Sequence, residues 1–95
     1  MPRDSNRPLP RAFKLHWGEG QIVEEATCES KYHEPSIQLL EFDDKTIEVR
    51  FCYYNLEGQF QRSPLIVGED EIKALRLALQ KTPRLKKLLE RLINS

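Results

Sequence analysis

The sequence predicts an α+β domain in which an antiparallel β-meander of about four strands is followed by two C-terminal helices. Apolar and polar residues alternate in several segments between residues 12 and 67, and turn-forming residues separate these segments. After Gly68 the apolar spacing changes to the helical period. Strands that come before helices, instead of alternating with them, are typical of the α+β class.

The length of 95 residues suits one small domain, which we place at residues 12–95. Within it, residues 12–67 are assigned to the sheet and residues 69–93 to the helical pair. Residues 1–11 contain three prolines among polar residues and are interpreted as a flexible Pro/Arg-rich arm. No segment resembles a secretion signal or approaches the ~20 apolar residues of a membrane span. We therefore expect a cytoplasmic protein that does not contact a membrane.

The first part of the sheet is expected to contain two strands. Residues 12–17 alternate between apolar and polar side chains, as in a half-buried strand, and the glycines at positions 18 and 20 provide a turn. Residues 21–27 follow as a short second strand. Residues 28–35 are polar and irregular and are interpreted as a loop, and the sequence leaves the path of residues 21–35 open.

Two strongly apolar segments, residues 37–42 and 47–53, form the clearest strand pair. Residues 43–45 read Asp-Asp-Lys, a tight-turn sequence, so the two segments are expected to pair as an antiparallel hairpin. Residues 55–58 predict a second turn, followed by a return strand. Pro64 lacks a backbone N–H, so this last strand is expected to lie at an edge or to be interrupted there.

The end of the chain predicts two amphipathic helices. Three acidic residues, 69–71, stand where a helix N-terminus is electropositive, and apolar residues then recur every three or four positions. Thr82 and Pro83 are expected to begin the second helix, which ends near Ile93. Its leucines form one stripe, and its basic residues share another face.

Catalytic and metal-binding patterns are weak. Four potential metal ligands are scattered along the chain: His16, Cys28, His33 and Cys52. Their spacing matches neither a zinc finger nor a zinc ribbon. Cys28 and His33 have no third group to orient them for nucleophilic catalysis, and the familiar nucleotide-binding and metalloprotease motifs are missing. We therefore expect no enzymatic activity, no cofactor and no small-molecule substrate.

The formal net charge is zero, with 15 basic and 15 acidic residues, but opposite charges are segregated along the chain. Residues 1–18 carry a net charge of +3, residues 19–48 carry −7, and residues 81–95 carry +4. A basic segment attracts phosphate, and it also attracts the acidic middle of a second copy.

One face of the strand at residues 47–54 combines an aromatic ring with an arginine. Single-stranded nucleic acid binds to open sheets through rings that stack on bases and cations that meet phosphates. The candidate nucleic-acid-binding residues are Arg50, Tyr54 and Arg62 on the sheet and Arg84, Lys87 and Arg91 on the last helix. The alternative is an ordinary solvent-facing side of an antiparallel sheet.

A strand containing Arg50 and Tyr53-Tyr54, a turn closing at Gly58, a second strand and a helix follow one another in residues 47–79. This order resembles the strand-strand-helix half of positive-cofactor-type transcriptional coactivators, and also the four-strand-plus-helix domains of the purine-rich-element-binding type. The resemblance implies a curved four-stranded sheet, a helix-mediated dimer and binding of single-stranded DNA or RNA. Residues 61–64 replace the lysine-rich stretch of the family, which implies weak, salt-sensitive binding.

Two functions are therefore open at the level of the sequence. The first is a small accessory protein that binds single-stranded DNA or RNA on its sheet. The alternative is a protein-interaction or dimerisation domain that uses its helical pair and has no nucleic-acid activity. A homodimer is expected in either case, because a small sheet with two leucine-rich helices has apolar area left over.

Overall fold

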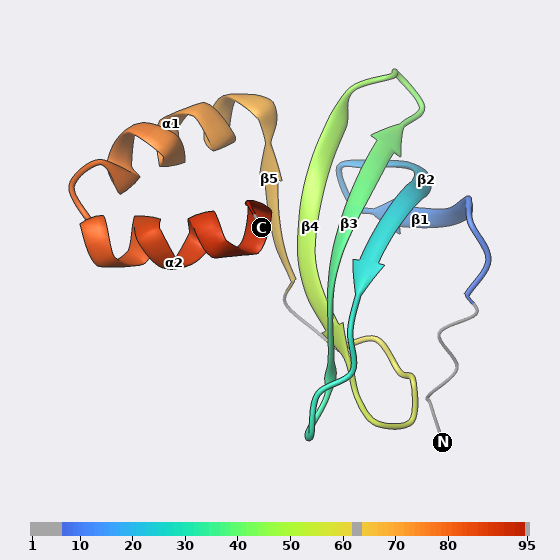
Figure 1. The fold of residues 1–95 in the computed structure, drawn as a ribbon. Helices are drawn as coiled ribbons and strands as arrows, with labels where there is room; N and C mark the ends of the chain where they lie inside the picture. Colours follow the sequence, from blue (N-terminus) through green and yellow to red (C-terminus); the bar gives the residue numbers. More distant parts are fainter. Residues whose placement is uncertain (1–6, 62–63, 95) are drawn as a thin grey trace.

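A computed structural model describes residues 7–61 and 64–94, and Figure 1 shows how they are arranged. Five strands form one antiparallel sheet in chain order: β1 (Arg11–Leu15), β2 (Gly18–Thr27), β3 (Glu34–Phe42), β4 (Ile47–Tyr54) and β5 (Leu65–Gly68). Two helices follow: α1 (Glu69–Leu79) and α2 (Pro83–Ile93). The predicted α+β fold, with an antiparallel sheet followed by two helices, is confirmed. The sheet has one strand more than the four or so expected.

The turns of the meander are fixed by short polar side chains. In the β3–β4 turn, the Asp44 carboxylate accepts hydrogen bonds from the backbone N–H and the hydroxyl of Thr46, at 3.0 and 2.6 Å. Lys45 in the same turn has a φ of 75°, a conformation that costs a residue with a Cβ. After β4, Asn55 Oδ1 accepts two backbone N–H groups, and Gly58 has a φ of 84°. These interactions set the two hairpins that the sequence predicts.

The hydrophobic core is small and lies on one face of the sheet, which we call the inner face. Its buried members are Phe13, Ile22, Leu40 and Phe42. The rings of Phe13 and Phe42 meet edge to face with centroids 5.0 Å apart. Gly20 permits this packing, because a Cβ at that position would lie 2.1 Å from the carbonyl oxygen of Glu41 on β3.

The two helices begin where the sequence predicts. The Gly68 backbone N–H donates to Glu71 Oε1 at 2.9 Å, which stabilises the first turn of α1. Pro83 occupies the first turn of α2, and Thr82 precedes it as the N-cap residue. Neither helix has the length and apolar character needed to cross a bilayer, as judged over the described residues.

The helical pair extends away from β5, on the opposite side of the β3–β4 pair from β1 (Figure 1). α1 contacts β5 and α2, while α2 has no comparable contact with any strand. Not one residue of either helix is buried. The helices therefore stand beside the sheet instead of covering it.

The proposed N-terminal arm falls only partly within the described residues. Residues 1–6 lie outside them. Arg7 forms an ion pair with Glu34 of β3, and Arg11 belongs to β1. From Arg7 onward, the segment therefore contacts the inner face of the sheet.

Candidate functional site

The polar side of β4 faces inward. Arg50 and Tyr54 retain only 7% and 5% of their accessible surface, whereas Phe51 and Tyr53 on the other side retain 40% and 45%. The expectation that Arg50 and Tyr54 lie on an open sheet face is therefore wrong. We call the side that carries Phe51 and Tyr53 the outer face.

Arg50 and Tyr54 belong to a largely buried set of polar side chains, which we call the polar cluster. Hydrogen bonds join six of its members: Arg11, Glu25, Ser36, Gln38, Arg50 and Tyr54. Arg7, Thr27 and Glu34 form a second hydrogen-bonded group, and Arg7 connects it to the first by lying over the Tyr54 ring. Gln38 lies at its centre with an exposure of 1%. The Gln38 amide nitrogen donates to the Tyr54 hydroxyl at 2.9 Å and to Glu25 at 2.7 Å. Its oxygen accepts from Arg50 Nε at 2.7 Å, so one side chain links three strands.

Two arginines from the N-terminal part of the chain neutralise the carboxylates of the cluster. Arg7 Nη2 lies 2.6 Å from Glu34, and its guanidinium carbon lies 3.7 Å from the centroid of the Tyr54 ring. Arg11 Nη2 donates to Glu25 at 3.1 Å and to the Tyr54 hydroxyl at 2.9 Å. Buried charges are tolerated when they are paired and hydrogen-bonded in this way.

The environment of the cluster shifts two pKa values. Burial acts to raise the pKa of Glu25, but hydrogen bonds from Gln38 and Ser36 and the charge of Arg11 outweigh it, so the pKa lies below its ordinary value. Burial raises the pKa of the Cys52 thiol, which therefore stays protonated at neutral pH. Such a thiol is a poor nucleophile.

The four potential metal ligands do not come together. Cys28 is exposed, and Cys52 is half-buried in the sheet. Among residues 7–61 and 64–94, no group of three or more His, Cys, Asp or Glu side chains is placed so that it could hold a metal ion.

The outer face is apolar and largely open. The strand register brings apolar side chains to it from β3, β4 and β5, among them Ile37, Leu39, Ile47, Val49, Phe51, Tyr53, Leu65 and Val67. Of these, Val67 is buried and the others are half-buried or exposed. Leu65 is 60% exposed. Sheets normally bury such a face against another layer, so the exposed one is a surface that gains free energy when a further chain covers it.

Two carboxylates stand at the margin of this surface. Glu24 pairs with Leu39 across β2 and β3, and Glu41 follows Leu39 two positions later on the same side of β3. A shallow groove runs here along Glu24, Ala26, Ile37, Leu39 and Val49, and we call it the outer groove. Within the described residues, neither carboxylate forms an ion pair.

The helix α2 carries two parallel rows of side chains. The leucine row consists of Leu85, Leu88 and Leu92, all at least half exposed. The basic row consists of Arg84, Lys87 and Arg91, and it lines a shallow hollow together with Leu88. The basic row makes no ion pair with any described residue.

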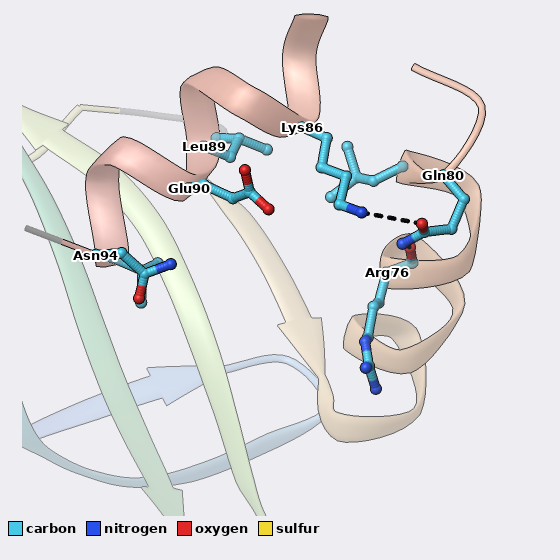
Figure 2. A pocket seen from close by; sticks show the side chains of 8 residues that line it. Arg76, Gln80, Lys86, Leu89, Glu90 and Asn94 are labelled. Carbon is cyan, nitrogen blue, oxygen red and sulfur yellow. Dashed lines mark hydrogen bonds between the residues drawn. The ribbon is translucent and has the colours of Figure 1, made fainter. Parts of the chain in front are cut away.

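The two helices leave a groove between them. It is lined by Arg76, Gln80, Lys86, Leu89, Glu90 and Asn94, among others (Figure 2). Lys86 Nζ donates to Gln80 Oε1 across this groove at 3.0 Å. This groove does not include the leucine row, which lies outside the contact between the two helices.

The structure divides the candidate nucleic-acid-binding residues into separate groups. Arg50 and Tyr54 are in the polar cluster, the basic row is on α2, and Arg62 lies outside the described residues. Sequence reasoning missed the role of the buried partners Glu25, Glu34 and Gln38. For Glu34 and Gln38 the available signal was their position in β3, because both have the same parity as the core residues Leu40 and Phe42. Glu25 lies in β2, where it pairs with Gln38.

Comparison of the chain with protein-family models, with curated proteins and with solved structures finds no match.

Proposed function

We propose that this chain is a protein-interaction domain that forms a homodimer through the outer face and the helical pair. The observation that carries the proposal is the exposure of apolar side chains on both elements: Phe51, Tyr53 and Leu65 on the sheet and the leucine row on α2. Two helices that bury no residue gain little from their own hairpin, since short helices depend on packing for their stability. A second chain would supply that packing.

Sedimentation velocity across the micromolar concentration range tests the proposal. We expect a dimer, and we expect Phe51→Asp and Leu88→Asp each to shift the protein toward monomer, because each places a charge in an apolar interface. Leu56→Asp is the matched control, since Leu56 is 51% exposed but lies in the turn after β4. A wild-type protein that stays monomeric would refute homodimerisation.

A second candidate function is binding of single-stranded nucleic acid through the basic row. Its support is the clustering of three cations within two turns of one helix, without acidic partners among the described residues. Arg50 and Tyr54 do not contribute to this candidate, because both are buried.

Fluorescence anisotropy with a labelled single-stranded oligonucleotide at low salt tests the second candidate. If three phosphates are contacted, log K falls with log salt with a slope of about −2. Replacing the basic row with alanine should abolish that binding, whereas Lys14→Ala and Lys73→Ala should not. Binding that is equal in the basic-row variant and the control would remove this candidate.

A further inference from the structure

We propose that α2 of one copy docks in the outer groove of a second copy. The leucine row then lies on Ile37, Leu39 and Val49, and the basic row lies opposite Glu24 and Glu41. This inference rests on the proposed homodimer and specifies its geometry. It follows from two surfaces of the chain that are complementary in polarity and charge.

The outer groove and the exposed side of α2 match in polarity. The outer groove has an apolar floor of Ile37, Leu39 and Val49, and Glu24 lines it. Glu41 lies on the same side of β3, two positions beyond Leu39. The leucine row is an apolar ridge, and cations stand beside it. An apolar ridge with a basic flank fits an apolar groove with an acidic flank, and opposite charges on the two sides fix the register.

The leucine row and the outer groove also match in length. Leu85 and Leu92 are separated by seven residues, which is about 10 Å along an α-helix. The outer groove extends from β2 across β3 to β4, and two inter-strand spacings amount to about 10 Å. The leucine row is therefore long enough to cross the groove.

The helix α2 does not fill the outer groove of its own chain. Leu92 of α2 lines a neighbouring hollow with Phe51 and Tyr53, and this hollow meets the outer groove at Ala26 and Ile37. Leu85 and Leu88 are at least half exposed, and the helical pair that carries them extends away from β5 (Figure 1). The leucine row is thus largely exposed, and α2 of the same chain approaches the outer groove only at Ala26 and Ile37.

A second copy is the occupant favoured by these observations because the chain carries both halves of the contact. Two copies related by a two-fold axis would form the contact twice, as isologous dimers do. The segregation of charge along the sequence, −7 in residues 19–48 and +4 in residues 81–95, then becomes attraction between chains. An acidic groove would repel nucleic acid, so phosphate is not its natural occupant.

The experiment uses two variants with reversed charges. Variant A carries Arg84→Glu, Lys87→Glu and Arg91→Glu, and variant B carries Glu24→Lys and Glu41→Lys. Alone, each variant would bring like charges together at both contacts of its dimer. Mixed, variant A supplies an acidic helix to the basic groove of variant B, and variant B supplies a basic helix to the acidic groove of variant A. Only the heterodimer restores both contacts.

The readout is the dissociation constant of each dimer, measured by sedimentation, and the composition of the mixture, measured by native mass spectrometry. Each surface ion pair changes the dissociation constant about two- to threefold, and the proposed dimer contains four such pairs. We therefore expect the dissociation constant of each variant alone to be at least ~20-fold higher than that of the wild type. The mixture should return to within ~5-fold of the wild type as an A–B heterodimer. Circular dichroism verifies that both variants are folded.

The control variant carries Lys31→Glu, Lys45→Glu and Lys73→Glu, which changes the net charge as much as variant A does but leaves α2 intact. Its dimer should resemble that of the wild type at moderate salt. If it weakens as variant A does, net charge and not the docked helix explains the effect, and the inference fails.

The remaining outcomes separate the failure of this inference from the failure of the proposed function. A wild-type monomer overturns both. A wild-type dimer that survives in variants A and B, or a mixture that gives no heterodimer, overturns the docking of α2 but leaves the homodimer. Wild-type association that nuclease treatment abolishes overturns the inference in favour of bridging by nucleic acid.

Discussion

The substitution Gln38→Leu is expected to cost about 3–4 kcal/mol of stability, although it replaces a polar residue with an apolar one of similar size. Gln38 is buried between Glu25, Arg50 and Tyr54 and bonds to all three. Hydrophobicity alone would predict that Gln38→Leu raises stability, because burial of leucine is normally favourable. We expect the opposite because the substitution removes three hydrogen bonds from the polar cluster.

The magnitude follows from the partners that the substitution leaves behind. Arg50 Nε loses its acceptor and has no other within the described residues, and an unpaired buried donor on a charged group costs about 2–3 kcal/mol. The Tyr54 hydroxyl and Glu25 lose one donor each but keep Arg11, so their loss adds about 1 kcal/mol. Replacing both ends of the strongest bond, as in Gln38→Leu with Arg50→Met, should recover at least half of the cost.

Urea unfolding followed by far-ultraviolet circular dichroism measures these changes, at a fixed protein concentration because self-association contributes to stability. With an m-value of about 1.5–2 kcal/mol/M, Gln38→Leu should lower the midpoint by about 2 M. Gln21→Leu, at an exposed glutamine of β2, is the matched control. A Gln38→Leu protein that loses less than about 1 kcal/mol, or a double variant no more stable than the single one, would refute the reasoning.

Three further predictions concern single residues. The pKa of Glu25 is lower in the folded chain than its ordinary value of 4.5, so the carboxylate stabilises the fold above pH 4.5. This contribution should be lost as the pH falls through the depressed pKa. Glu25→Gln should therefore flatten that part of a plot of the free energy of unfolding against pH. Lys45→Gly should raise stability by about 0.5 kcal/mol, because glycine adopts the positive φ freely, while Lys45→Val should lower it by about 1 kcal/mol; thermal unfolding shows both signs. Gly20→Ala should cost about 2 kcal/mol or more, because its Cβ would overlap the Glu41 carbonyl, whereas Gly68→Ala meets nothing closer than 3.5 Å and should be nearly neutral in the same assay.

Most elements of this fold could be predicted from the sequence because they depend on local patterns. The first turn is an exception, because the structure ends β1 at Leu15 and places both Gly18 and Gly20 in β2, whereas the sequence predicts the turn at these glycines. The turn at Asp44 and Lys45, the proline at the start of α2 and the alternation in β4 are all set by residues within a few positions of one another. These signals do not depend on which chain covers which face.

The orientation of the sheet could not be predicted in the same way. An alternating strand such as β4 shows that its two sides differ, and the apolar side is normally the buried one. Here the polar side is buried, because Arg7 and Arg11 reach Glu34 and Glu25 from distant positions in the chain. Those pairings are long-range, and a periodicity within one strand contains no information about them.

The same distinction between local and long-range information applies to the candidate nucleic-acid-binding residues. The basic row was assigned to one face of a helix from its spacing alone, and the helix places all three side chains on the surface. Arg50 and Tyr54 were correctly placed on one side of β4, but their side became the interior once the polar cluster formed. Local geometry was predictable, and burial was not.

The contacts of Arg7 and Arg11 also determine how short this protein can be made. A fragment that starts at Ala12 would keep every strand except for the first residue of β1, and it would appear intact on a secondary-structure diagram. It would nevertheless lack both guanidiniums that neutralise the carboxylates of Glu25 and Glu34, two anions that the sheet keeps away from water. A fragment that keeps both ion pairs therefore has to include Arg7, which precedes the first strand.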